Sequence, residues 1–148
     1  MINIGRYNIW SYHHLAYLVI PTNIGWKSNM DNVMGAGLAK QVATRYPNIP
    51  NALGWLYKSG KHNCHVMEQL KLIFFPVKPL ARNPAMSWSQ PASLSLIEES
   101  ARDLGTIVLT SLVVVPHVGC GNGGLDWNEV KPILDKYLDH RFLQIDPL

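Results

Sequence analysis

Residues 113–127 read Val113-Val114-Val115-Pro116-His117-Val118-Gly119-Cys120-Gly121-Asn122-Gly123-Gly124-Leu125-Asp126-Trp127. A β-branched run ends at Pro116, a glycine-dense turn follows, and a helix is predicted to begin near Asp126. Four glycines within six positions exceed the one or two that a simple turn needs. A strand, a glycine loop and a helix N-terminus often bind phosphate, because glycines let the backbone approach the ligand and the helix dipole favours negative charge. The alternative is a glycine-rich connection that binds no ligand.

Residues 15–46 repeat this construction. Leu15 to Ile20 form a continuous apolar run that ends at Pro21, which is typical of a strand buried on both faces. A polar loop rich in asparagine and glycine follows, and a helix is predicted from about Gly35 to Tyr46. Small residues also permit close helix packing, so Met34–Gly37 is weak evidence by itself. Its place after a second buried strand strengthens the interpretation as a ligand loop.

The remaining pattern alternates between strands and helices. A short edge strand is expected near Tyr7–Trp10. Helices are predicted over residues 50–60, 91–104 and 127–138, and strands over residues 65–67, 70–75, 107–115 and 141–145. The strands over residues 65–67 and 70–75 are expected to pair as a hairpin. This alternation predicts an α/β layered domain with a mostly parallel central sheet.

Length and composition are those of one globular domain, expected to cover residues 1–148. The chain is 47% hydrophobic and 16% charged, with a net charge of +3. No apolar run is long enough to span a membrane, and the N-terminus lacks the layout of a signal peptide. We therefore expect a cytoplasmic monomer without a membrane partner. The mild positive charge is compatible with nucleic acid or a phosphorylated ligand, although Lys and Arg form no run.

Cysteine and histidine usage predicts neither a disulfide nor a metal site. Cys64 and Cys120 are the two cysteines, and a lone disulfide is not expected in a cytosolic chain. The cluster His62-Asn63-Cys64-His65 offers three potential metal ligands, but no second ligand pair lies at a suitable spacing. We expect no metal and no cofactor.

Three segments follow predicted buried strands. In parallel α/β sheets, ligands bind beyond the carboxyl ends of the strands. The residues after Ile20, Phe75 and Val115 all lie at such ends. We therefore expect one crevice that is bordered by the loop 23–37, by Lys78 and by the loop 119–124.

Lys78 stands between two prolines just past a strand. The prolines hold it on a stiff segment with its amine free to project. On sequence alone, Lys78 also fits an ordinary surface lysine.

Three groups of residues together resemble the macrodomain family. They are Asn23 followed by Val33–Gln41, then Phe75–Lys78, and then Gly119–Trp127. Their order and spacing match over about residues 15–138, and the resemblance is greatest to the branch that contains the DarG antitoxin and the terminal ADP-ribose glycohydrolases. The string GCGNGGLDW is quite specific to DarG-like members, whereas MGAG alone is not.

The resemblance implies a three-layer α/β/α macrodomain with a mixed, mostly parallel sheet that holds ADP-ribose. It implies that the glycine loop wraps the diphosphate and that Lys78 lies near the anomeric carbon of the distal ribose. The ligand-binding residues that it implies are Asn23, Gly35, Ala36, Gly37, Val118, Gly119, Cys120, Gly121, Asn122, Gly123, Gly124 and Leu125. DarG-like enzymes remove ADP-ribose from a nucleobase in DNA, and related members remove it from acidic side chains in proteins.

The chain also departs from the family pattern. Some relatives have a catalytic aspartate at the position of Gly123, and the next acid here, Asp126, is expected to cap the last helix instead. Many macrodomains carry Gly-Asp-Ile near the N-terminus, whose aspartate contacts adenine. Residues 5–9 lack this motif, which leaves Asn8 or Trp10 as substitutes. Residues 26–32 are longer than in DarG and are expected to remodel the rim of the distal ribose.

These departures make Lys78 the strongest catalytic candidate. Its ammonium polarises the ribose ring oxygen, or its neutral amine attacks the anomeric carbon, which needs a lowered pKa. His117 is either an acid or base or, the interpretation we favour, a partly buried strand-end residue. The expected function is hydrolytic removal of ADP-ribose from a macromolecule, with DNA favoured slightly by the positive charge and Arg82. A non-catalytic ADP-ribose reader and a phosphatase acting on ADP-ribose 1″-phosphate stay open.

Overall fold

Six strands form one sheet in the computed structural model, which describes residues 1–148. The strands lie in the order β1-β6-β5-β2-β4-β3, and every neighbouring pair is parallel except β3 and β4. Their bounds are β1 (Ile2–Arg6), β2 (Ala16–Asn23), β3 (His65–Met67), β4 (Leu72–Lys78), β5 (Leu112–Val115) and β6 (Phe142–Asp146). The sheet is therefore mixed and mostly parallel, and the predicted hairpin of β3 and β4 is confirmed.

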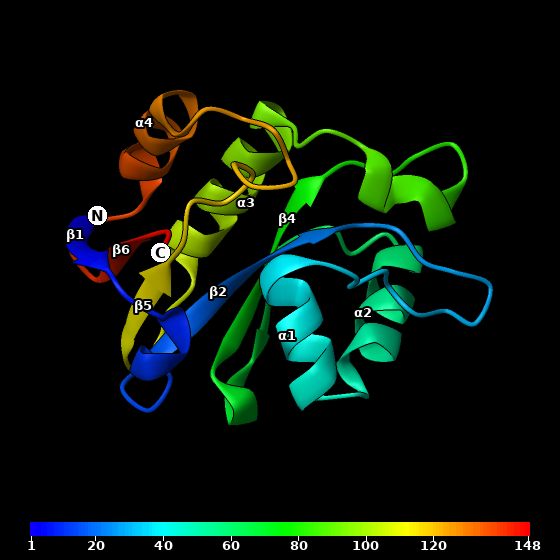
Figure 1. Cartoon of the computed structure of the whole chain (residues 1–148), viewed down its shortest axis with the longest axis horizontal. Coiled ribbons are helices and arrows are strands. Elements are labelled where there is room, and N and C mark those ends of the chain that lie inside the picture. The colour runs from blue at the N-terminus through cyan, green and yellow to red at the C-terminus, as the bar shows by residue number, and fades with distance from the viewer.

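Helices cover both faces of this sheet (Figure 1). The α-helices are α1 (Gly37–Arg45), α2 (Ile49–Lys58), α3 (Leu94–Thr106) and α4 (Trp127–Tyr137). The pair α1 and α2 lies on one face, and the pair α3 and α4 lies on the other. Three short 3-10 helices complete the chain: η1 (Ile9–Tyr12), η2 (Glu68–Leu70) and η3 (Pro84–Ser89). None of the helices combines the length and the apolar character that crossing a membrane requires.

Strand β2 supplies side chains to both cores. Tyr17 and Val19 belong to the cluster shared with α3 and α4, whereas Leu18 and Ile20 belong to the cluster shared with α1 and α2. All four side chains are fully buried. Successive side chains of a strand point to opposite faces, so one continuous apolar run fills both cores. The predicted three-layer α/β/α fold is confirmed.

The prediction of an edge strand near Tyr7–Trp10 is wrong. The edge strand is β1, which pairs in parallel with β6, and residues 9–12 form η1 instead. The Asn8 side chain caps this turn by accepting a hydrogen bond from Trp10 N at 3.0 Å. An asparagine that bonds its own backbone two residues on favours a turn over a strand.

The strand predicted over residues 107–115 is too long. Only Leu112–Val115 form β5, and Val108 is 91% exposed. The neighbouring strands explain the difference, because β2 begins at Ala16, which pairs with Leu112. Residues 107–111 therefore have no partner on that side. Helix α3 likewise begins at Leu94 rather than Pro91, because Ser93 caps it by accepting from Leu96 N.

Strands β2 and β4 continue past the prolines that were expected to end them. β2 runs through Pro21 to Asn23, and β4 runs through Pro76 to Lys78. Beyond Leu18, β2 has β4 as its only neighbour, and beyond Phe74, β4 has β2 as its only neighbour. A strand with one free edge tolerates a residue that lacks an N–H group. The two extensions bring Asn23 opposite Lys78 in the register.

Candidate functional site

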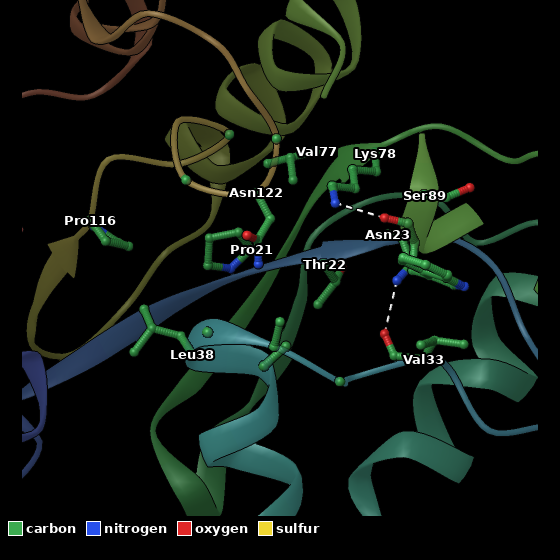
Figure 2. Close-up of a pocket in the computed structure, with 18 of the residues that line it drawn as sticks. Pro21, Thr22, Asn23, Val33, Leu38, Val77, Lys78, Ser89, Pro116 and Asn122 are labelled. Atoms are coloured by element: carbon green, nitrogen blue, oxygen red, sulfur yellow. Dashed lines mark hydrogen bonds between the residues drawn. The ribbon is translucent and has the colours of Figure 1, made fainter. Parts of the chain in front are cut away.

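A cavity of about 830 Å³ lies at the carboxyl ends of β2, β4 and β5 (Figure 2). This volume is within the range of pockets that enclose small ligands. Its walls come from the three segments that the sequence placed in one crevice, so that prediction is confirmed. Nine of the predicted site residues line the cavity, namely Asn23, Gly35, Ala36, Gly37, Lys78, Gly119, Gly121, Asn122 and Gly123.

Four of the predicted ligand residues are not part of this lining. Val118 is fully buried in the core beside α3 and α4, and Leu125 packs against the same core. Cys120 turns its Sγ toward the Val118 carbonyl oxygen, 3.4 Å away, and burial raises the pKa of its thiol. Gly124 has φ +77°, which only glycine adopts without strain. These residues shape the loop, and their contact with a ligand stays a prediction.

Lys78 and Asn23 lie side by side at one end of the cavity, and Pro116 lies at the other (Figure 2). The Lys78 ammonium donates a hydrogen bond to the Trp88 carbonyl oxygen at 2.7 Å. Burial lowers the pKa of Lys78. The amine is thus held at the cavity wall by a backbone acceptor, with two further N–H bonds available to a ligand.

Asn23 is fixed by a second asparagine, Asn32. Asn23 Nδ2 donates to the Val33 carbonyl oxygen at 2.9 Å, and Asn23 Oδ1 accepts from Asn32 Nδ2 at 2.9 Å. Asn32 Nδ2 also lies 3.1 Å from the Asn23 carbonyl oxygen and 2.8 Å from that of Gly25. Asn32 is only 2% exposed. The sequence did not single out Asn32, and the asparagine-rich character of residues 23–32 was the only signal.

Replacing Asn32 by aspartate is expected to destabilise the protein by about 3 kcal/mol and to weaken ligand binding. The carboxylate has the same size, but it turns a donor into a buried negative charge that faces three oxygens. Urea unfolding and calorimetry with ADP-ribose measure both effects. Asn48→Asp is the matched control, because Asn48 is exposed and its side chain makes no capping bond at the start of α2. Equal stability of the two variants would contradict the positioning role.

The glycine loop presents unpaired backbone donors to the cavity. Leu125 N donates to the Gly119 carbonyl oxygen at 3.0 Å, which closes the loop on itself. The N–H groups of Gly121, Asn122 and Gly123 make no hydrogen bond within the protein, and all three residues line the cavity. Consecutive free N–H groups form a concave site for an anion.

Helix α1 begins on the opposite wall of the cavity, below the glycine loop in Figure 2. Its N-cap, Ala36, offers no side-chain acceptor. The first three N–H groups of α1, those of Gly37, Leu38 and Ala39, have no acceptor in the protein, and their residues line the cavity. A helix N-terminus attracts anions through its dipole and its free donors. Two sets of anion-binding donors therefore face each other across one cavity.

Comparisons with known proteins identify relatives of this chain. No family model matches the chain. The DNA ADP-ribosyl glycohydrolase of Mycobacterium tuberculosis is 33% identical over 115 residues, which are 70% of this chain and 31% of that protein. The protein of the same name from Thermus aquaticus is 28% identical over 123 residues, 75% of this chain and 32% of that protein. The chain thus spans about a third of the length of the curated relatives that it matches.

A solved structure extends the likeness to the whole chain. The macrodomain of Mycobacterium tuberculosis DarG matches with a TM-score of 0.75 and 27% identity, covering 99% of this chain and 97% of that one. The chain is a DarG-type macrodomain. The Thermosipho africanus DarTG structure in complex with ADP-ribose has the same fold, with a TM-score of 0.73 at 21% identity.

The macrodomain has no room for an acid at Gly123. A Cβ atom there would lie 2.4 Å from the Gly119 carbonyl oxygen and 2.7 Å from Ala92 Cβ. The loop aspartate of some relatives is therefore excluded by the closure of this loop. Asp126 caps α4 as predicted, its Oδ1 accepting from Asn128 N at 2.9 Å.

The residues expected to replace the adenine contact of other macrodomains do not line the cavity. Asn8 is occupied as the cap of η1. Trp10 donates from Nε1 to Gln41 Oε1 at 2.5 Å, and the Arg45 guanidinium lies over its ring, 3.9 Å from the centroid. Trp10 therefore packs against α1, and Asn8 serves as the cap of η1.

His117 lines the macrodomain cavity and directly follows Pro116 in the chain. Its ring stacks on Trp127 with a centroid separation of 3.9 Å, and its Nε2 lies 2.8 Å from Asp146 Oδ1. Hydrogen bonds from Gln144 and His117 lower the pKa of Asp146. These contacts fit the favoured interpretation of a partly buried strand-end residue better than an acid or base at the ribose.

The His62–His65 cluster does not converge. His62 Nε2 meets the Tyr57 carbonyl oxygen, His65 Nε2 meets that of Lys61, and Cys64 Sγ meets that of Ser100. No three side chains of a kind that ligates metals gather in the structure.

Proposed function

We propose that this macrodomain is an ADP-ribosyl glycohydrolase that releases ADP-ribose from DNA. The observation that carries the proposal is that one cavity has two chemically different regions. One region is lined by two facing sets of free N–H groups. The neighbouring end holds the half-buried amine of Lys78 beside the fixed side-chain amide of Asn23. The relatives named DNA ADP-ribosyl glycohydrolase support this function and this acceptor.

The ligand's diphosphate lies between the glycine loop and the start of α1 in this proposal. Each anionic phosphate there meets backbone donors that need no rearrangement, because they are already free. The distal ribose then extends toward Asn23 and Lys78, since the free donors lie between these residues and Pro116. The ribose carbon that carries the macromolecule ends near the Lys78 amine.

Hydrolysis breaks the bond between that anomeric carbon and the acceptor atom, and water supplies a hydroxyl to the carbon and a proton to the acceptor. As an ammonium, Lys78 donates to the ribose ring oxygen and favours ring opening. As a neutral amine, it attacks the anomeric carbon and loses a proton, which passes to the leaving acceptor, and water then releases the adduct. Burial favours loss of the proton, whereas the hydrogen bond to Trp88 favours its retention. Both routes use one nitrogen atom.

Incubation with three substrates side by side tests the function. The substrates are an ADP-ribosylated DNA oligonucleotide, an ADP-ribosylated protein and ADP-ribose 1″-phosphate. We expect release of ADP-ribose from the oligonucleotide. Release of inorganic phosphate alone would identify a phosphatase, and calorimetric binding of ADP-ribose with no turnover of any substrate would identify a reader. Either result would overturn the proposal.

A further inference from the structure

The short helix η3 separates two hollows on the surface. Trp88 and Ser89, at its end, line the main cavity next to Lys78. Pro84 and Ala85, at its start, line a second hollow of about 480 Å³. The other residues of this second hollow are Trp26, Lys27, Ser28 and Asn83. Helix η3 therefore lines the main cavity with its last residues and the second hollow with its first residues.

Helix η3 (Pro84–Ser89), here called the η3 ridge, is held by hydrogen bonds and close packing, and it carries an exposed aromatic side chain. Ser87 Oγ donates to the Pro84 carbonyl oxygen at 2.8 Å and accepts from Ala81 N at 3.0 Å. Gly25 packs so closely beneath that a Cβ atom there would lie 2.1 Å from the Pro84 carbonyl oxygen. Trp88 is nevertheless 48% exposed. A large aromatic ring presented on a fixed turn is a stacking platform.

Positive charge is distributed unevenly along the chain. Residues 1–97 contain nine Lys and Arg against two Asp and Glu, whereas residues 98–148 contain four against eight. The first part includes α1, α2 and η3, and the second includes α3 and α4. Lys27 lines the second hollow, and Arg82 directly precedes Asn83 in its wall. Neither side chain has an ion-pair partner, so both are free to meet a polyanion.

We propose that the η3 ridge and the second hollow bind the single DNA strand that carries the ADP-ribosylated base, an inference that rests on the proposed function. The bond to be cleaved lies inside the cavity near Lys78, and a base stacked and paired in a duplex cannot reach such a site. The strand is therefore unpaired there. A flanking base stacks on Trp88, and the phosphates of the strand meet Lys27 and Arg82.

Binding of an unmodified fluorescent single-stranded oligonucleotide, followed by anisotropy over a salt series, tests this surface without ADP-ribose. The double variant Lys27→Glu/Arg82→Glu is expected to weaken binding at least about tenfold and to reduce the salt dependence by about two charges. Lys61→Glu is the control for each single substitution of this pair, because it changes the net charge by the same amount. Helix α2 begins beside residues 26–32, where Asn32 N donates to the Pro50 carbonyl oxygen, and Lys61 follows the other end of that helix.

A second pair of variants tests stacking. Trp88→Ala is expected to weaken oligonucleotide binding about tenfold. Trp55→Ala is the matched control, because Trp55 is 54% exposed on α2 and lies outside both hollows. The inference would be overturned if all four variants bound the oligonucleotide as tightly as the unaltered protein does. It would also be overturned if each test variant lost no more affinity than its control.

Turnover separates this inference from the proposed function. Lys27→Glu is expected to slow hydrolysis of an ADP-ribosylated oligonucleotide at low concentration but not that of an ADP-ribosylated mononucleoside. Equal slowing of both substrates would overturn the strand-binding role. If the unaltered protein hydrolyses neither substrate, the proposed function fails, and the anisotropy measurements still decide whether the surface binds DNA.

Discussion

Lys78→Ala is expected to slow the release of ADP-ribose from modified DNA by a factor of about 10² to 10⁴, while calorimetry still detects binding of free ADP-ribose. Binding persists because the N–H groups of the glycine loop and of α1 are backbone groups that the substitution leaves in place. Turnover is lost because Lys78 is the one amine in the lining of the cavity. An alanine variant that works at the rate of the unaltered protein would remove Lys78 from the mechanism.

The pH dependence of the same reaction distinguishes the two roles of Lys78. Burial places the pKa of Lys78 below its usual value, so the neutral fraction grows at a lower pH than for a free lysine. If the neutral amine attacks, the rate rises as the pH increases through that pKa. If the ammonium polarises the ring oxygen, the rate falls through the same pKa. Lys78→Arg keeps a cation that does not attack, and it should retain activity only under the second role.

The convergence of the site could be predicted from the sequence because it depends on topology. The carboxyl ends of parallel strands share one edge of a sheet, and buried strands are visible as apolar runs such as Leu15–Ile20 and Val113–Val115. Once the strands are recognised, the loops after them must meet. The cavity at the ends of β2, β4 and β5 follows from that rule.

The finer geometry depends on pairing that local sequence does not contain. Pro21 and Pro76 resemble strand ends, yet both strands continue because each has only one neighbour at that point. The adjacency of Asn23 and Lys78 follows from those extensions. The support of Asn23 by Asn32 depends on how the loop between them folds back, which residue types alone do not specify.

Gly123→Ala is expected to lower the affinity for ADP-ribose more than tenfold and to destabilise the protein by about 1–3 kcal/mol. The new methyl group would lie 2.4 Å from the Gly119 carbonyl oxygen and 2.7 Å from Ala92 Cβ, so the loop must open to accept it. Opening displaces the Gly119 carbonyl oxygen that Leu125 N holds, and with it the free donors aimed into the cavity.

Gly121→Ala tests whether binding depends on the closed shape of the glycine loop or only on the bulk added to the cavity wall. A Cβ atom on Gly121 meets nothing within 4 Å, and φ of Gly121 lies outside the left-handed region, so the fold accepts alanine there. Both residues line the cavity, and both substitutions add one methyl group. Thermal unfolding and calorimetry should therefore show a loss of stability and affinity for Gly123→Ala but little change for Gly121→Ala. Equal losses of affinity with unchanged stability would mean that added bulk, and not the closed shape of the glycine loop, controls binding.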